Sequence, residues 1–230
     1  MAKIDNNNET NSPIITDFES IASEAIQKLQ TNITFSSFEK KIKIIGVTSS
    51  VQGEGKSTLL VNMANIYASK GAKVCVVDLD LRRSNVHHLY NVPNKIGIVE
   101  YVTGEANISD IIEHSTTGVD VIPSGSKVPF PTSVLESPKI HALLDELKNM
   151  YDYVLVDATP VLVVADATIV SKYLDGYIFA TEQNHTKKSN VVESLKILKS
   201  SGANIIGIVI TKSKEMEKNK EQYYYYQDTK

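Results

Sequence analysis

Residues 44–71, IIGVTSSVQGEGKSTLLVNMANIYASKG, join an apolar run, a glycine-containing turn and a helical pattern. The apolar run predicts a buried strand, and from Leu59 onward apolar residues recur at helical spacing. Gly53 and Gly55 allow the backbone between the two elements to bend, so that several amide N–H groups can face one point at the start of the helix. This stretch therefore predicts a strand–turn–helix unit whose turn binds an anion.

The turn ends in residue types that suit a nucleotide phosphate. Lys56 can reach the β- and γ-phosphates, and the Ser57 hydroxyl can bind magnesium. The strict pattern G-x-x-x-x-G-K-S/T begins with glycine, whereas this chain has Ser50 at that position. We expect the phosphates to be bound by Gly53, Glu54, Gly55, Lys56, Ser57 and Thr58.

The composition is that of a globular protein with one domain. The chain has 230 residues, enough for one domain with tails, and its net charge of −3 gives no electrostatic attraction to nucleic acid. The single cysteine, Cys75, excludes an internal disulfide. No stretch approaches the ~18 uncharged residues of a membrane span, and residues 1–10 lack the apolar core of a signal peptide. We therefore expect a cytoplasmic protein.

Apolar runs and helical patterns alternate along the rest of the chain. Near-continuous apolar strands separated by helices imply a mostly parallel sheet with helices on both faces, a three-layer α/β sandwich. The domain is expected over residues 16–212, after a disordered lead over residues 1–15 and before a flexible tail over residues 213–230. Strands are predicted at 42–49, 72–80, 119–125, 151–160, 175–182 and 204–212, and helices at 17–33, 57–70, 133–150, 166–173 and 187–201.

Two of the predicted strands end in acidic residues. The run VCVVDLDLRR brings Asp78 and Asp80 to one strand end, where alternation places both carboxylates on the same side, and YVLVDATP brings Asp157 to another. In a parallel sheet these ends lie beside the phosphate-binding turn. A lysine, magnesium and a further carboxylate that accepts a hydroxyl proton suffice for phosphoryl transfer. The three acids therefore predict a phosphoryl-transfer site.

The last residues, EQYYYYQDTK, contain four consecutive tyrosines, Tyr223–Tyr226, after a run of lysines and glutamates. A packed core would not use aromatic side chains at such a place. From Lys212 to Tyr223 the chain spans at most about 36–40 Å when extended and about 17–20 Å as a flexible coil. Either length permits transfer to a neighbouring subunit, and reach alone leaves transfer within the chain's own site open as well.

Together these motifs resemble the bacterial tyrosine kinases of capsule and exopolysaccharide synthesis. Over about residues 20–226, SSVQGEGKST resembles their Walker A motif, VVDLDLRR their second Walker motif and YVLVDATP their Walker B motif, and the terminal tyrosine cluster is also similar. The resemblance implies a P-loop NTPase-like fold and an ATP- and Mg²⁺-dependent protein-tyrosine kinase. It also implies residue roles. Asp78 is the base and acts together with Lys56 and Asp80. Magnesium is bound by Ser57, Asp80 and Asp157, and the autophosphorylation sites are Tyr223, Tyr224, Tyr225 and Tyr226.

The expected N-terminal helix departs from the family pattern. The family has E-x-x-R-x-x-R there, which helps to close a ring of subunits, whereas this chain has Glu24, Gln27 and Gln30. Glutamine forms hydrogen bonds but not the charge-assisted pairs of arginine. We expect a homo-oligomer, a ring weaker than those of its relatives. Phosphorylation of four tyrosines would add about −6 to −8 charges per chain and oppose close packing of the tails.

The resemblance also implies a membrane partner. In the one-chain form of the family a transmembrane activator precedes the kinase, and this chain resembles the split form, in which a separate membrane protein of the polysaccharide co-polymerase type supplies an activating cytoplasmic tail. We therefore expect a location at the inner face of the plasma membrane, weak activity without the partner, and a role in polysaccharide synthesis.

Two other functions share parts of this pattern. A ParA/MinD-like ATPase has the same sheet and Walker motifs, but its loop carries a lysine where this chain has Val51. A nucleotide-gated scaffold without protein kinase activity stays open from the sequence. ATP is favoured over GTP, because residues 211–214, TKSK, lack the asparagine and aspartate of the guanine-reading N-K-x-D motif.

Overall fold

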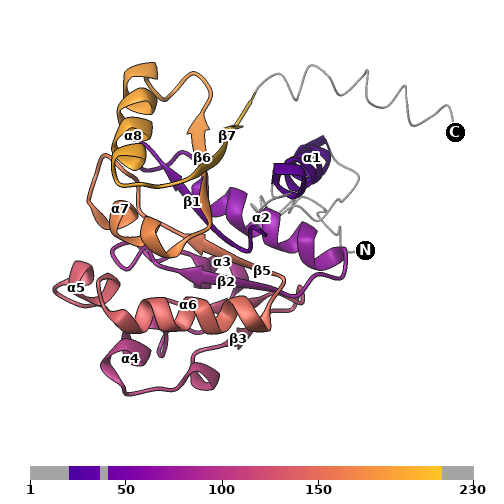
Figure 1. Ribbon diagram of the computed structural model, residues 1–230. Coiled ribbons are helices and arrows are strands. Elements are labelled where there is room, and N and C mark those ends of the chain that lie inside the picture. The colour runs from indigo at the N-terminus through magenta and orange to yellow at the C-terminus, as the bar shows by residue number, and fades with distance from the viewer. Residues whose placement is uncertain (1–20, 37–40, 214–230) are drawn as a thin grey trace, which may run out of the picture.

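The computed structural model describes residues 21–36 and 41–213. The predicted lead over residues 1–15 and the tyrosine cluster Tyr223–Tyr226 lie outside the described residues. A mostly parallel sheet forms the middle layer, and helices cover both of its faces (Figure 1). The predicted three-layer α/β sandwich is therefore confirmed.

The sheet contains every predicted strand and one short edge strand that the sequence pattern does not reveal. Its strands are β1 (Ile44–Ser49), β2 (Val74–Asp78), β3 (Glu113–His114), β4 (Asp120–Ile122), β5 (Tyr153–Asp157), β6 (Gly176–Glu182) and β7 (Ile205–Thr211). They follow the order β3-β4-β2-β5-β1-β6-β7. Only the pairing of β3 with β4 is antiparallel among the described strands. β3 is too short to give a periodic signal in the sequence.

The helices pack on alternate side chains of the strands. They are α1 (Ile21–Ser36), α2 (Lys56–Ser69), α3 (Val86–Tyr90), α4 (Ile98–Thr103), α5 (Pro131–Leu135), α6 (Pro138–Met150), α7 (Asp166–Val170) and α8 (Lys188–Ser200). α1, α2 and α3 cover the face to which β1 contributes Ile45 and Val47. α4, α5, α6 and α7 cover the opposite face, to which β1 contributes Ile44, and α8 packs on β6.

The single helix predicted over residues 133–150 is wrong, because two helices occupy this stretch. α5 ends at Leu135 and α6 begins at Pro138, whose ring lacks the N–H that a continuous helix would need. The Ser137 hydroxyl caps α6 by accepting the Lys139 backbone N–H at 3.3 Å. The Ser137-Pro138 pair is therefore the sequence signal for the break.

α1 lies against α2, as Figure 1 shows. On the side of α1 that packs against the core, Leu29 is partly buried and Ile33 is buried. Ile26 is also buried. None of the described helices, α1 included, is both long enough and apolar enough to cross a membrane.

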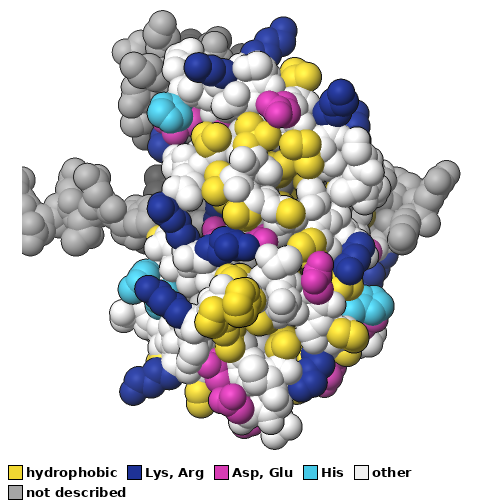
Figure 2. Space-filling view, turned by 90° about the vertical axis from the view of Figure 1, so that its left-hand side faces the viewer, with side chains coloured by type: hydrophobic (Ala, Val, Ile, Leu, Met, Phe, Trp, Pro, Cys, Tyr) yellow, Lys and Arg dark blue, Asp and Glu magenta, His cyan; other side chains and the backbone are white. Residues whose placement is uncertain are grey.

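Hydrophobic side chains also gather on the surface. The face seen in Figure 2 carries two groups of them, with Lys and Arg side chains between and around the groups. Among the described residues, Phe130 is 75% exposed, and the edge strand β7 exposes Ile208 and Ile210 by 51% and 58%. Exposed apolar surface of this kind is suited to contacts with other chains.

The carboxyl ends of β1, β2 and β5 meet at one edge of the sheet. Asp157 of β5 pairs with Val47 of β1 on one side and with Asp78 of β2 on the other. The turn that follows β1 leads directly into α2. The phosphate-binding turn and the strand-end acids are therefore neighbours, as the sequence predicts.

Candidate active site

The turn between β1 and α2 has the backbone shape that its glycines predict. Gly53 and Gly55 have φ angles of 83° and 80°, in the left-handed region that favours glycine. α2 begins directly after Gly55 and closes its first turn with a 2.9 Å hydrogen bond from Leu59 N–H to the Gly55 carbonyl. The first N–H groups of a helix have no acceptor within the helix, so this turn offers donors to an anion.

Lys56 lies at the centre of a buried charge cluster. Its Nζ is 3.1 Å from Asp80 Oδ2 and 3.1 Å from Asp157 Oδ1, and the three side chains are only 13%, 6% and 1% exposed. Burial acts against the charge on Lys56, but the carboxylates of Asp157 and Asp80 outweigh it and raise its pKa. Lys56 is therefore a fixed positive charge at the mouth of the turn.

The oxygen atoms beside Lys56 suit a magnesium ion. The Ser57 hydroxyl donates to Asp157 Oδ2 at 2.7 Å, and the carboxylate of Asp80 lies on the other side of Lys56. Burial raises the pKa of Asp157, although Lys56 and Ser57 act in the opposite direction. Within residues 21–36 and 41–213, no group of three or more His, Cys, Asp or Glu side chains forms a metal site by itself. Ser57, Asp80 and Asp157 thus fit Mg²⁺ only as part of a site completed by phosphate and water oxygens.

Asp78 is held behind this cluster. β2 ends at Asp78, so Asp80 lies in the following turn and not in strand alternation with it. Asp78 Oδ2 accepts hydrogen bonds from the Ser84 hydroxyl and from the N–H groups of Asn85 and Val86, and Oδ1 accepts the Asp80 N–H. Burial, followed by the nearby charge of Asp157, raises the pKa of Asp78 to about 7. This proton affinity suits a general base at neutral pH, but Asp78 is 0% exposed and both of its carboxylate oxygens already accept hydrogen bonds, so the structure does not place it in contact with a substrate.

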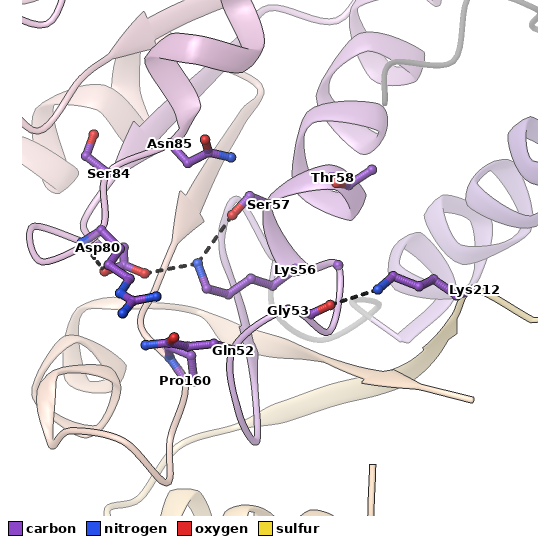
Figure 3. Close-up of a pocket in the computed structure, with 12 residues that line it drawn as sticks. Gln52, Gly53, Lys56, Ser57, Thr58, Asp80, Ser84, Asn85, Pro160 and Lys212 are labelled. Carbon is purple, nitrogen blue, oxygen red and sulfur yellow. Dashed lines mark hydrogen bonds and ion pairs between the residues drawn. The ribbon is translucent and has the colours of Figure 1, made fainter. Parts of the chain in front are cut away.

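A pocket of about 530 Å³ opens over the turn (Figure 3). Half of its lining residues are site residues predicted from the sequence: Gly53, Gly55, Lys56, Ser57, Thr58 and Asp80. Asp78 and Asp157 are not among its lining residues. The sequence does not select the remaining lining residues, which are Gln52, Arg83, Ser84, Asn85, Pro160 and Lys212.

Glu54 is also brought to the turn, but its side chain points elsewhere. The residue is fully buried, and its Oε2 accepts the Val51 N–H at 2.7 Å. Its Oε1 accepts the Thr186 hydroxyl, which lies between β6 and α8. The carboxylate therefore braces the loop, and only the backbone of Glu54 is left to serve a phosphate.

The two arginines after β2 have different surroundings. Arg82 makes a two-point contact with the buried carboxylate of Asp166, with Nε 2.7 Å from Oδ2 and Nη2 3.2 Å from Oδ1. The same Nη2 donates to the Thr132 hydroxyl at 3.1 Å. Arg82 thus ties the turn after β2 to α5 and α7, whereas Arg83 lines the pocket.

The expected oligomer residues on α1 form contacts within the chain. Glu24 lies 3.8 Å from Lys28, Gln27 donates to the Ser23 hydroxyl, and Gln30 accepts from Lys70. Their role between subunits stays a prediction.

Comparisons with known proteins give one consistent result. An AAA domain family model matches residues 42–185. The putative tyrosine-protein kinase CapB of Staphylococcus aureus is 30% identical over 90% of this chain and 91% of its own length. The tyrosine-protein kinase CpsD of Streptococcus agalactiae serotype III is 33% identical over 84% of this chain and 83% of its own. Among solved structures, the kinase domain of the Escherichia coli tyrosine kinase ETK superimposes with a TM-score of 0.78 and 30% identity, covering 83% of this chain and 76% of that one.

Proposed function

The chain belongs to the AAA domain family and, within it, to the bacterial tyrosine kinases, and from this premise we propose that it phosphorylates its own C-terminal tyrosines, Tyr223–Tyr226. ATP supplies the phosphoryl group, and the tyrosines of one subunit enter the site of another. The length of chain between Lys212 and Tyr223, about 36–40 Å when extended, permits this transfer between subunits.

One observation carries this proposal. Lys56 Nζ lies between the carboxylates of Asp80 and Asp157, 3.1 Å from each, at the start of a helix whose preceding turn contains two left-handed glycines. A fixed cation, converging amide donors and oxygen ligands are the groups that phosphoryl transfer requires. A structural salt bridge alone would not need them at the edge of an open pocket.

The proposed transfer uses Asp78 as the base. The phenol oxygen of a tyrosine forms a bond to the γ-phosphorus, the bond from that phosphorus to the ADP oxygen breaks, and the phenol proton passes to Asp78. A pKa of about 7 supports this role, because the carboxylate is partly unprotonated at neutral pH and still binds a proton well. Lys56 and the loop amides hold the phosphates in line during the step.

Ser57, Asp80 and Asp157 are the proposed residues for Mg²⁺. When bound, the ion neutralises charge on the phosphate oxygens. The hydroxyl of Ser57 and the carboxylate of Asp157 already lie within 2.7 Å of each other, which supports a shared ion.

Incubation with labelled ATP and Mg²⁺, followed by mapping of the label, tests the proposed activity. We expect phosphotyrosine within residues 223–226 and none in a Lys56→Met chain. Release of phosphate without labelled protein would instead support a ParA/MinD-like ATPase, and nucleotide binding without either product would support a scaffold.

We also propose that a membrane protein activates the kinase through its cytoplasmic segment and that the pair regulates capsular or exopolysaccharide synthesis at the inner face of the plasma membrane. The exposed apolar side chains of Phe130, Ile208 and Ile210 support binding to another chain. Adding the cytoplasmic segment of a candidate partner should increase the autophosphorylation rate several-fold. Full activity of the isolated chain, with no further increase, would argue against the activator.

The proposed assembly is a homo-oligomer that phosphorylation loosens. Gln27 and Gln30 stand where the family has arginines, and this supports a weaker ring. Light scattering after size exclusion should give a mass above that of one chain before ATP is added and a lower mass afterwards. Equal masses before and after full phosphorylation would rule out the disassembly.

A further inference from the structure

The outer side of the phosphate loop is held by the end of β7. The Thr211 hydroxyl donates to the Glu54 carbonyl oxygen at 2.7 Å, and Lys212 Nζ donates to the Gly53 carbonyl oxygen at 3.0 Å. Figure 3 shows Lys212 reaching Gly53 from the side opposite to Asp80. Two successive carbonyl groups of the loop are therefore fixed by two successive residues, Thr211 at the end of β7 and Lys212 directly after it.

Fixing a carbonyl also fixes the next amide. The described residues contain no cis peptide bond, and in a trans peptide the C=O and N–H groups point in opposite directions. When Lys212 holds the Gly53 carbonyl, it turns the Glu54 N–H away from β7. When Thr211 holds the Glu54 carbonyl, it turns the Gly55 N–H in the same way. Both amides belong to the loop around the pocket where we place the phosphates.

We propose that Thr211 and Lys212 are positioning residues that aim the Glu54 and Gly55 amides at the phosphates of the nucleotide. The inference rests on the proposed nucleotide site and adds two supporting residues at the end of β7 and directly after it. Neither residue needs to touch the reacting atoms.

The surroundings of Thr211 support this role. Its hydroxyl carries one proton and lies 2.7 Å from the Glu54 carbonyl but 3.3 Å from the Thr181 carbonyl of β6. The shorter contact takes the proton, because hydrogen bonds weaken with distance. The loop, and not the neighbouring strand, is thus the main partner of this hydroxyl.

The backbone of Lys212 has a conformation that is rare for a lysine. Its φ angle is 51°, in the left-handed region that non-glycine residues rarely adopt. Glu182 at the end of β6 accepts from its Nζ at 2.8 Å and keeps the ammonium beside the loop. The lysine side chain is 57% exposed, so its ion pair adds little to the stability of the fold. A strained backbone with little gain in stability points to a functional contact.

Binding of two phosphate probes to the full chain tests the proposal. Calorimetry would compare Mg²⁺–ADP with inorganic triphosphate and Mg²⁺, because the second probe has phosphates but no base. Lys212→Met and Thr211→Val should each bind both probes about three- to tenfold more weakly than the wild type, the effect of one hydrogen bond. Lys199→Met and Thr31→Val, at exposed positions on α8 and α1, serve as matched controls and should bind both probes as the wild type does.

A glycine at position 212 separates positioning from folding. Lys212→Gly relieves the left-handed backbone, so the thermal midpoint should stay equal or rise, while both probes still bind about three- to tenfold more weakly. Lys212→Arg, which keeps a donor, should recover part of the affinity.

Three results would overturn the inference: unchanged triphosphate affinity in both Lys212→Met and Thr211→Val, weaker binding of ADP alone, or a weaker affinity in Lys212→Gly that is matched by a lower thermal midpoint. The second would place Lys212 against the base instead of the loop. Failure of the wild-type chain to bind ADP would overturn the proposed function itself, and this inference with it.

Discussion

Lys56 and Lys212 lie on opposite sides of the phosphate loop, and their surroundings differ (Figure 3). On the inner side, Lys56 is 13% exposed and lies between two carboxylates that are 6% and 1% exposed. On the outer side, Lys212 is 57% exposed, and its carboxylate partner, Glu182, is 17% exposed. The inner side faces β2 and β5, and the outer side faces β6 and β7.

The difference indicates that the two sides of the loop have different roles: the inner side takes part in the reaction, and the outer side holds the loop in place. A buried charge that loses its partner is costly, whereas an exposed ion pair contributes little, so replacing the inner lysine should lower the stability of the fold and replacing the outer lysine should hardly change it. The inner side supplies the groups that act on the phosphates. The outer side acts through the direction of two backbone amides. Mutations on the inner side should therefore change the reaction rate strongly, whereas mutations on the outer side should change nucleotide affinity by a smaller factor.

The largest expected effect comes from removing the inner charge. Lys56→Met deletes the cation between Asp80 and Asp157, and we expect the rate of phosphotyrosine formation to fall at least about a hundredfold. Initial rates from phosphotyrosine detection measure this, with Lys199→Met as the control that keeps its rate. A rate within threefold of the wild type would show that Lys56 does not take part in the reaction, and the proposed difference between the two sides would be wrong.

The pH dependence should follow Asp78. Because its pKa is about 7, the unprotonated fraction rises with pH, and the rate should increase about tenfold between pH 6 and pH 8. In Asp78→Asn the remaining rate should lose this slope. A wild-type rate that is flat over the same range would exclude Asp78 as the base.

The stability should follow the opposite course. The raised pKa means that the folded chain holds the Asp78 proton between about pH 4 and pH 7 while the unfolded chain has lost it, so the contribution of this group to stability decreases as pH rises through that window. Relative to the wild type, Asp78→Asn should therefore be more stable at pH 8 than at pH 5. Denaturant unfolding at the two pH values measures the difference, and an equal difference at both would contradict the buried environment of Asp78.

A smaller effect is expected for the proposed metal ligand. Ser57→Ala removes the hydroxyl that lies 2.7 Å from Asp157, and the Mg²⁺ concentration for half-maximal rate should rise about tenfold. The matched control is Ser200→Ala at the end of α8. An unchanged Mg²⁺ requirement would show that Ser57 serves only as a partner for Asp157.

The smallest effect should come from the outer carboxylate. Glu182→Gln keeps a hydrogen-bond acceptor for Lys212 and removes only the charge, so ADP affinity should fall no more than about threefold. Calorimetry at low and high salt measures it, and the small loss should disappear at high salt. If Glu182→Gln lowered the ADP affinity about a hundredfold, the outer side would be as important for nucleotide binding as the inner side is for the reaction rate, and the comparison would fail.

The inner side could largely be predicted from the sequence, because its residues lie in contiguous motifs. Lys56 and Ser57 follow the glycine turn, and Asp157 ends an apolar run, so local patterns suffice to place them. The relation of Asp78 to Asp80 could not be predicted in the same way. β2 ends two residues before Asp80, which strand alternation would require it to include, and Asp80 enters the cluster from the segment that follows the strand.

The outer side could not be predicted, since it depends on contacts between distant parts of the chain. Lys212 and Gly53 are 159 residues apart, and residues 211–214 match no motif that would link them to the loop. The carboxylate of Glu54 looks like a phosphate-loop residue in the sequence, but only the fold reveals that Thr186 and the Val51 amide use it. Periodicity finds strands and helices, and it carries no information about such cross-sheet partners.

Mixing two inactive variants tests the central claim most directly. A Lys56→Met chain keeps its tyrosines but has no active site, and a chain with Tyr223–Tyr226 all changed to phenylalanine keeps its site but has no acceptor. With ATP and Mg²⁺, we expect phosphotyrosine on Tyr223–Tyr226 of the Lys56→Met chain only when both chains are present. Mass spectrometry that finds no phosphotyrosine in this mixture, while wild-type chains become labelled, would contradict transfer between subunits, and absence of label from the wild type as well would contradict the kinase site.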